Sequence, residues 1–246
     1  MRLETYREKE NLGRRIRILR KGSTLALRFD DVGYFNRVYA GDETFLDHLT
    51  EIEEFYCGSP FGCELITPPQ SNGCRISRPG WQIANSYAWM HAPDCRSVYR
   101  EQPAEFDIRN PERSERHQFL LAYLRGFEAQ EVRFPAALRN MRHLFDRPEL
   151  EFLMAWHCGK PAGVGMTMRC DSAALLCAGA ALPEFRQRGC HAALLAARIR
   201  SASETGCREL YSWAILNGQS QANLERAGLS VVGTAEAWRF SSRGPA

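Results

Sequence analysis

A basic, glycine-containing loop between two apolar runs holds the residues best suited to chemistry. Residues 186–191 (Arg-Gln-Arg-Gly-Cys-His) follow the apolar run 173–182 and precede the helix-like run 192–197. A strand that turns directly into a helix leaves unpaired backbone N–H groups and the positive end of the helix dipole at one place. Because such a place stabilises an anion, the loop is predicted to bind a pyrophosphate.

The spacing of the loop excludes two common phosphate-binding motifs. A dinucleotide-binding turn requires three glycines and a nucleotide-hydrolase loop requires Gly-Lys-Ser/Thr, and neither is present. The loop resembles the signature of the GNAT superfamily, the acyl-CoA-dependent N-acyltransferases, in which Arg/Gln-x-x-Gly-x-Gly/Ala follows a strand ending near a proline. Arg186 and Gly189 hold the first two anchor positions and Pro183 lies in the lead-in, but His191 replaces the usual small residue.

A second segment supports the resemblance. After the aromatic, strand-like run 209–214, residues 217–229 resemble the second superfamily signature, an Asn opening a helix that ends in an Arg/Lys-x-Gly-Phe-like cap. Gly228 is predicted to be a left-handed residue at the end of that helix. The two segments have the expected order and separation. The resemblance covers the chain from residue 105 onward well and the preceding residues loosely.

The resemblance implies an α/β fold of the GNAT type, with a mixed sheet splayed open where CoA enters. The sequence agrees with that order of elements, which are a strand at 106–109, helices at 117–126 and 135–145, strands at 151–157 and 162–168, a strand at 173–182 leading into the loop, and a last strand ending at residue 240. We place a module boundary near Pro103, so that residues 105–246 form the N-acetyltransferase domain.

Residues 1–104 are less regular. They predict a strand at 34–38, an amphipathic helix at 43–56, and strands at 62–66 and 82–90. Since no Arg/Gln-x-x-Gly loop occurs there, we interpret this part as a degenerate GNAT-like module, giving two tandem modules. The alternative is an unrelated α+β cap, and both interpretations leave the chemistry to the C-terminal module.

The resemblance also implies which residues hold the cofactor. Backbone groups of the strand before the loop would face the pantetheine, the loop and first helical turn would contact the pyrophosphate, and two asparagines would contact the pantetheine amides or the acetyl region. In this order the residues are Gly179, Ala180 and Ala181; Gln187, Arg188, Gly189, Cys190, His191 and Ala192; and Asn217 and Asn223.

Several of these residues have a second interpretation. The small residues of the strand suit a crowded sheet core as well as a close cofactor. Asn217 could cap a helix. His191 could make a charge-assisted phosphate contact or face solvent without a role. Cys190 could be a reactive thiol, because a helix N-terminus beside Arg188 lowers a thiol pKa, although a backbone role is favoured.

The sequence leaves the catalytic acid and base unassigned. Leu224 occupies the place where many family members carry a tyrosine that could protonate the leaving thiolate, and the strand 173–181 contains no carboxylate. Five titratable residues lie in segments that could border the acceptor cleft, namely Glu128, Glu131, His157, Tyr211 and Glu236.

Composition limits the other classes of function. The chain has 246 residues, 44% hydrophobic, with a net charge of +3, which is too mild for a nucleic-acid-binding protein. The basic cluster 14–21 is interpreted as a solvated strand or helix edge rather than a nucleic-acid patch. No apolar run could span a bilayer and residues 1–8 mix both charges, so we expect a cytoplasmic protein without a membrane partner. The nine cysteines include no Cys-x-x-Cys pair, which favours reduced core cysteines and no metal.

The predicted function is transfer of an acetyl group from acetyl-CoA to a primary amine of a small molecule or peptide. One alternative is an acyltransferase whose donor is an acyl-carrier protein or an aminoacyl-tRNA, served by the basic cluster. Another is a catalytically silent acyl-CoA-binding module, suggested by Leu224. The identity of the acceptor, and whether the chain is a monomer or a homodimer, stay open.

Overall fold

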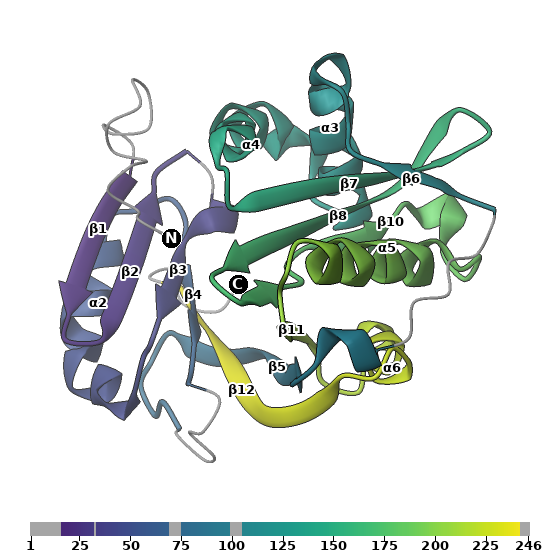
Figure 1. Cartoon of the computed structure of the whole chain (residues 1–246). Helices are drawn as coiled ribbons and strands as arrows, with labels where there is room; N and C mark the ends of the chain where they lie inside the picture. The colour runs from purple at the N-terminus through teal and green to yellow at the C-terminus, as the bar shows by residue number, and fades with distance from the viewer. Residues whose placement is uncertain (1–15, 32, 69–74, 99–104, 242–246) are drawn as a thin grey trace. The chain divides into compact units, whose positions relative to one another are not determined.

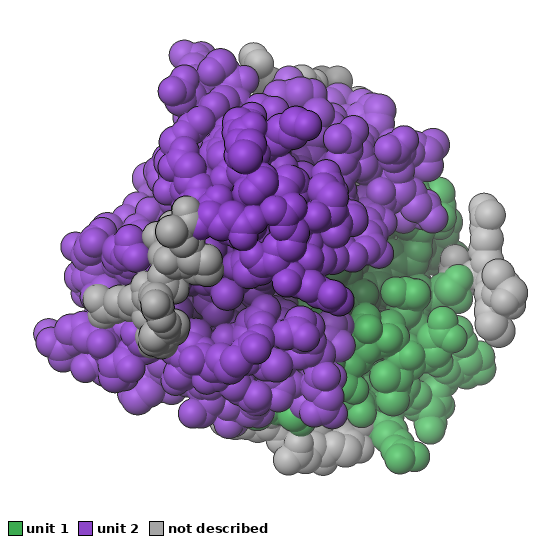
Figure 2. Space-filling model, turned by 90° about the vertical axis from the view of Figure 1, so that its right-hand side faces the viewer, with its two compact units in different colours: residues 1–87, 233–246 green, residues 88–232 purple. Residues whose placement is uncertain are grey.

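The chain forms two compact units. The computed structural model describes residues 16–31, 33–68, 75–98 and 105–241. Unit 1 contains residues 1–87 and 233–246, and unit 2 contains residues 88–232 (Figure 2). Two long strands, β5 (Trp81–Ala92) and β12 (Ser230–Phe240), each have residues in both units.

Unit 1 is a sheet with one helix packed on it (Figure 1). Its strands lie in the order β1 (Ile16–Lys21), β2 (Thr24–Phe29), β3 (Arg37–Tyr39), β4 (Cys63–Ile66) and β12. β3 and β4 are parallel, and the other pairs are antiparallel. The 3-10 helix η2 (Glu43–His48) and α2 (Leu49–Tyr56) bury Phe45, Ile52 and Tyr56 against this sheet.

The predictions for unit 1 are confirmed in part. The helix predicted at 43–56 begins as a 3-10 turn, because the Asp42 carboxylate accepts the Thr44 N–H at 2.9 Å and fixes a tight start. The strand predicted at 34–38 begins only at Arg37. Before it, the 3-10 turn η1 (Gly33–Phe35) is closed by Asn36 N–H donating to the Gly33 carbonyl at 3.0 Å. β4 and β5 match the predicted strands.

The first two strands of unit 1 comprise the basic cluster and a strand that the sequence pattern does not predict. The described part of the basic cluster, residues 16–21, is the strand β1, with Arg17 and Arg20 exposed as expected for a solvated edge. Residues 14 and 15 lie outside the described residues. β2 was not predicted, because nearly all its residues are buried and its sequence therefore lacks alternation.

Unit 2 contains a mixed sheet. Its strand order is β5, β11 (Glu209–Ile215), β9 (Ala173–Leu175), β8 (Lys160–Cys170), β7 (Leu150–His157) and β6 (Asp107–Arg109), and β10 (Gly179–Ala181) pairs with β8 beside β9. β11 and β9 are parallel, whereas β8 is antiparallel to β7, β9 and β10. This is the mixed α/β sheet that the sequence predicts.

Helices cover both faces of this sheet (Figure 1). They are α3 (Arg116–Gly126), α4 (Phe134–Met141), α5 (Cys190–Glu204) and α6 (Gln219–Arg226), with short 3-10 helices η3 (Cys95–Ser97), η4 (Arg113–Glu115), η5 (Glu131–Arg133), η6 (Arg142–Asp146) and η7 (Pro183–Phe185). Phe119 of α3 contacts Phe152 of β7, on one face. On the other face, Leu195 and Ile199 of α5 join the core that also contains Leu210 of β11. Among the described residues, no helix is long and apolar enough to cross a membrane.

Most elements of unit 2 agree with the sequence. The predicted helices correspond to α3 and to α4 with η6, and the strands at 106–109, 151–157, 162–168 and 209–214 correspond to β6, β7, β8 and β11. The strand predicted at 173–182 is wrong as a single element. It breaks at residues 176–178, where the Cys177 N–H donates to the Leu175 carbonyl at 2.9 Å and turns the chain out of the ladder.

The compact units do not coincide with the predicted modules 1–104 and 105–246. Unit 2 starts at Ala88, within β5, and residues 233–246 belong to unit 1. The difference arises because strand pairing, rather than order along the chain, decides which residues belong to one compact unit. The strands β5 and β12 each begin in one unit and end in the other. The module boundary near Pro103 lies outside the described residues and stays a prediction.

Candidate functional site

The loop between β10 and α5 has the geometry of an anion-binding turn. Gln187 and Gly189 have left-handed φ angles of 60° and 81°. Gly189 is the N-cap of α5, and no side chain caps the helix start. The N–H groups of the first turn therefore lack helical acceptors, and residues 186–189 are exposed. Ala192, also in the first turn, is exposed, and its small side chain leaves room for an anion to reach these N–H groups.

Both arginines of the loop form hydrogen bonds or ion pairs with neighbouring elements. Arg188 Nη2 donates to Glu105 Oε1 at 2.6 Å and lies 3.2 Å from His157 Nε2. Arg186 pairs with Glu128 and donates to the Gly126 carbonyl at 3.2 Å. Exposed ion pairs of this kind contribute at most about 1 kcal/mol. A phosphate could therefore compete with Glu105 for Arg188 at little cost.

Cys190 is not the reactive thiol that its position suggested. Its side chain is buried and its Sγ lies 3.4 Å from the Ala162 carbonyl. Burial raises the pKa of Cys190 to about 12, with the charge of Glu105 adding to the effect. Burial of the side chain thus argues against a reactive thiol. The eight cysteines in the described part of the chain are free thiols.

His191 is neutral at pH 7. Burial, and secondarily the charge of Arg198, lowers its pKa to about 4. The Asn223 side-chain amide donates to His191 Nδ1 at 3.0 Å. The neutral, partly buried His191 neither makes a charged contact nor faces solvent fully in this structure, and its part in phosphate binding stays a prediction. Its observed partner links the first turn of α5 to α6.

The edge of β10 presents free backbone groups. Met166 N–H donates to the Ala178 carbonyl at 2.7 Å, and Leu182 N–H donates to the Ala162 carbonyl at 2.9 Å. Because backbone direction alternates along a strand, Ala180 also turns its backbone to β8, whereas Gly179 and Ala181 turn theirs to the opposite edge. In the described structure no strand pairs with that edge. Two of the three predicted pantetheine-facing residues therefore have the required backbone direction, and Ala180 does not.

The sheet opens between β10 and β11. Leu176 N–H donates to the Tyr211 carbonyl at 2.8 Å, and the Ser212 hydroxyl donates to the Leu176 carbonyl at 2.9 Å. Beyond these bonds β11 follows β9 no further, and β10 pairs with β8 alone. The opening leads to the start of α5, as expected from the sequence.

A buried arginine that the sequence did not indicate stabilises this opening. Arg198 of α5 is 2% exposed. Its Nη1 donates to the carbonyls of Met166 and Cys177, both at 3.3 Å. Burial lowers its pKa to about 10, so it stays protonated at pH 7. The available signal was an arginine on the apolar side of α5, between Leu194, Leu195 and Ile199.

Glycine is required beside this arginine. A Cβ on Gly179 would lie 2.6 Å from Arg198 Nη2, and one on Gly165 would lie 2.9 Å from its Cδ. The glycine of β10 therefore serves the packing of the sheet, and the close approach of a cofactor at the free edge stays a prediction.

The segment before α6 differs from a capped helix start. The N-cap of α6 is Gly218, and exposed Asn217 precedes it with a φ of 60°. Asn217 N–H donates to Gln221 Oε1 at 2.7 Å. The helix-cap interpretation of Asn217 is therefore wrong, and its side chain stands outside the helix.

The end of α6 agrees with the sequence. Gly228 has the predicted left-handed conformation, with φ of 103°, and its N–H donates to the Glu225 carbonyl at 2.9 Å. Leu224, in the place of the family tyrosine, is 2% exposed and packs in the core. Asn223 also accepts a hydrogen bond from Gln219 at 3.1 Å.

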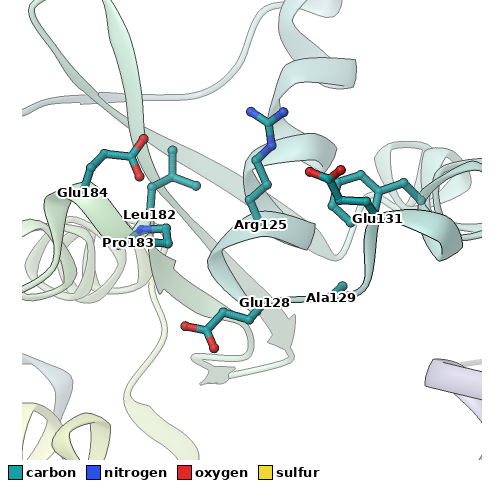
Figure 3. Close-up of a pocket in the computed structure, with 8 residues that line it drawn as sticks. Arg125, Glu128, Ala129, Glu131, Leu182, Pro183 and Glu184 are labelled. Carbon is teal, nitrogen blue, oxygen red and sulfur yellow. The ribbon is translucent and has the colours of Figure 1, made fainter.

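The five candidate bases do not converge. Glu128 and Glu131 border a pocket of about 300 Å³ beside the end of β10 (Figure 3), lined by Arg125, Glu128, Ala129, Glu131, Phe134, Leu182, Pro183 and Glu184. His157 contacts Glu105 and Arg188 instead. Glu236, in unit 1, accepts from the Trp238 indole at 3.0 Å. Tyr211 donates to Glu209 at 2.7 Å.

Three glutamates and one arginine line the pocket of Figure 3, and the carboxylate of one of them, Glu128, pairs with Arg186. In the described residues no group of three or more His, Cys, Asp and Glu side chains is arranged to hold a metal ion.

This geometry defines a class of fold, a mixed α/β sheet that opens beside the uncapped start of a helix. A GCN5-related N-acetyltransferase from Kribbella flavida is similar to the chain, with a TM-score of 0.66 and 16% identity over 94% of this chain and 91% of that one. One from Sphaerobacter thermophilus gives 0.63 and 15%, over 96% and 83%. A tandem GNAT protein from the clavulanic acid biosynthesis pathway gives 0.60 and 13%, over 93% and 82%.

The chain has the fold of the GCN5-related N-acetyltransferase (GNAT) superfamily. Its match to the tandem protein extends over both units and agrees with the expectation of two GNAT-like modules. At the level of sequence, comparison with protein-family models and with curated proteins gives no match.

Proposed function

We propose that the chain is a GNAT-type acyltransferase that moves an acetyl group from acetyl-CoA to a primary amine of a small molecule or peptide. The observation that carries this proposal is the continuity of the free β10 edge at Gly179 and Ala181 with the uncapped start of α5 at Gly189. The edge offers amide groups to a pantetheine arm, and the helix start offers N–H groups to a pyrophosphate.

The proposed cofactor contacts follow from these positions. Gly179 and Ala181 would bind the pantetheine amides, and the backbone from Gln187 to Ala192 would bind the pyrophosphate. Asn217 has an exposed side chain at the far side of the opening and stays a proposed contact. Asn223, whose amide donates to His191, also stays a proposed contact to the pantetheine amides or the acetyl region.

In the reaction the uncharged amine attacks the thioester carbonyl, the C–S bond breaks, and CoA leaves as a thiolate. The amine proton passes to a base or to water. Because a thiolate leaves without assistance, the buried Leu224 is compatible with turnover.

The same leucine favours a second candidate, a silent acyl-CoA-binding module. A cytoplasmic location stays a prediction of the sequence.

Calorimetric titration with acetyl-CoA, followed by thiol release with a panel of amines, tests the proposal. Gly189→Val should weaken acetyl-CoA binding by about ten-fold or more, because a branched residue disfavours φ of 81° and covers the N–H groups. Gly206→Val is the matched control, since Gly206 is also left-handed, at φ of 87°, beyond the other end of α5.

The outcomes separate the two candidates. Binding of acetyl-CoA without amine-dependent thiol release would favour the silent module. Unchanged affinity in Gly189→Val would contradict the loop assignment.

A further inference from the structure

A band of aromatic side chains lies on one face of β5 and β11 within unit 2. Along β11, Leu210, Ser212 and Ala214 are buried beside α5 and α6, so the alternate residues point to the opposite face. Tyr211 and Trp213 on that face are 37% and 39% exposed. We define the aromatic face as Trp89, His91, Glu209, Tyr211 and Trp213.

The members of the aromatic face contact one another across the two strands. The rings of Trp89 and Trp213 are 5.5 Å apart, and His91 stacks on Tyr211 at 4.6 Å. Partly exposed tryptophan and tyrosine side chains gathered in one place are typical of a binding surface. Trp89 Nε1, on the inner side of this cluster, is buried and has no hydrogen-bond partner among the described residues.

A single carboxylate gives the aromatic face a negative charge. Glu209 Oε2 accepts from the Tyr211 hydroxyl at 2.7 Å and lies 2.9 Å from His91 Nε2. These two hydrogen bonds, that of Tyr211 first, lower the pKa of Glu209, so it is ionised at neutral pH. Aromatic rings and a carboxylate together attract a cation, and the rings also stack on a flat group.

The aromatic face borders the opening of the sheet. Tyr211 is the last residue of β11 paired with β9, opposite Leu175, and its carbonyl accepts the last bond before β10 separates. The proposed function puts the pyrophosphate at the start of α5 and the pantetheine along β10, so the acyl end of the donor would lie at the other end of the opening, beside the aromatic face.

We propose that the aromatic face is the acceptor subsite and that it takes a primary amine attached to an aromatic ring. This proposal rests on the proposed function for the reaction, but not for the binding. The ring stacks on Trp213 and Trp89, and the ammonium group is attracted by Glu209. This site has stronger support than the pocket of Figure 3, whose lining is acidic but lacks stacked, exposed aromatic rings.

The test compares 2-phenylethylamine with n-butylamine in steady-state acetylation and in direct calorimetric binding. We expect a KM for 2-phenylethylamine about ten-fold or more below that for n-butylamine. Trp213→Ala should raise the first KM by about ten-fold and leave the second within about two-fold. Glu209→Gln should raise both, because both amines carry the charge.

A control variant and a folding test show whether the effect of Trp213→Ala is specific to the aromatic face. Tyr39→Ala is the matched control, since Tyr39 is a 47% exposed aromatic residue on β3 and outside the aromatic face. An unchanged circular dichroism spectrum and an unchanged acetyl-CoA affinity would show that Trp213→Ala is folded. If Trp213→Ala misfolds, Trp213→Leu takes its place.

The outcomes distinguish this proposal from the proposed function. Equal KM values for the two amines, or equal effects of Trp213→Ala on both, would overturn the acceptor subsite and leave the transferase standing. If no amine releases thiol but 2-phenylethylamine binds, and Trp213→Ala weakens that binding, the subsite stands and the transferase does not. Absence of binding and of turnover with 2-phenylethylamine overturns the subsite.

Discussion

Burial sets the protonation state of the two titratable side chains at the start of α5. Cys190 has a pKa raised to about 12 and His191 has a pKa lowered to about 4, and burial is the largest cause of both shifts. The first turn therefore presents backbone N–H groups and neutral side chains. At this scale the site is a place for an anion without a nearby reactive group.

His191 should make stability depend on pH. Its pKa is about 4 in the folded chain and 6.5 when unperturbed, so the unfolded chain binds the proton more readily. Its contribution is complete above pH 6.5 and is lost as the pH falls toward 4, up to about 3 kcal/mol. Urea unfolding at several pH values should show that His191→Gln loses less stability than the wild type between pH 7 and 4. Parallel curves for the two proteins would show that His191 is not buried as described.

Cys190 should resist alkylation in the native chain. A buried thiol with a pKa of about 12 is almost entirely protonated at pH 8, whereas Cys158 and Cys170 are exposed. Iodoacetamide labelling followed by peptide mass spectrometry should modify the two exposed cysteines at least about ten-fold faster. Rapid labelling of Cys190 would restore the reactive-thiol interpretation. Labelling in urea provides the control for the reagent.

Among the elements, the interrupted edge of the sheet is where we propose that the cofactor lies. The sequence predicts most helices and strands here because their apolar periods are regular, as in α3 and β7. It does not predict the break at residues 176–178, because the run 173–182 is apolar throughout and pairing partners are invisible in it. The sequence also fails to predict the burial of Arg198, because an arginine in a helix is normally solvated.

Arg198 should be required for both stability and the open edge. Arg198→Met removes a guanidinium that bonds the Met166, Cys177 and Leu194 carbonyls, so the free energy of unfolding should fall by about 3 kcal/mol. Acetyl-CoA affinity should fall as well, because Gly179 packs on the same guanidinium. Urea unfolding and calorimetry measure the two effects. Arg208→Met, at an exposed arginine of unit 2, is the control, and equal stability of the two variants would contradict the role.

For the whole molecule, the sequence predicts local backbone conformations better than the boundaries of the two units. The loop at 186–191 and Gly228 are recognised from local backbone demands, which glycine and helix starts reveal directly. The units are set by long-range pairing of β5 and β12, which no local pattern contains. The two segments that resemble the superfamily signatures both lie in unit 2, so we expect the cofactor to bind to unit 2.

Hydrogen exchange with and without saturating acetyl-CoA tests this distribution. The amides of Gly179, Ala181 and the first turn of α5 should exchange more slowly with the ligand, because they become hydrogen-bonded. The β1 and β2 hairpin of unit 1 contains none of the proposed contacts and should change little. At a ligand concentration about 100 times Kd the stabilisation is about 2.7 kcal/mol, and the melting temperature should rise by several degrees. Protection confined to the hairpin would place the cofactor outside the proposed site, whereas protection along β10 and α5 would favour a single continuous site from the sheet edge to the helix start.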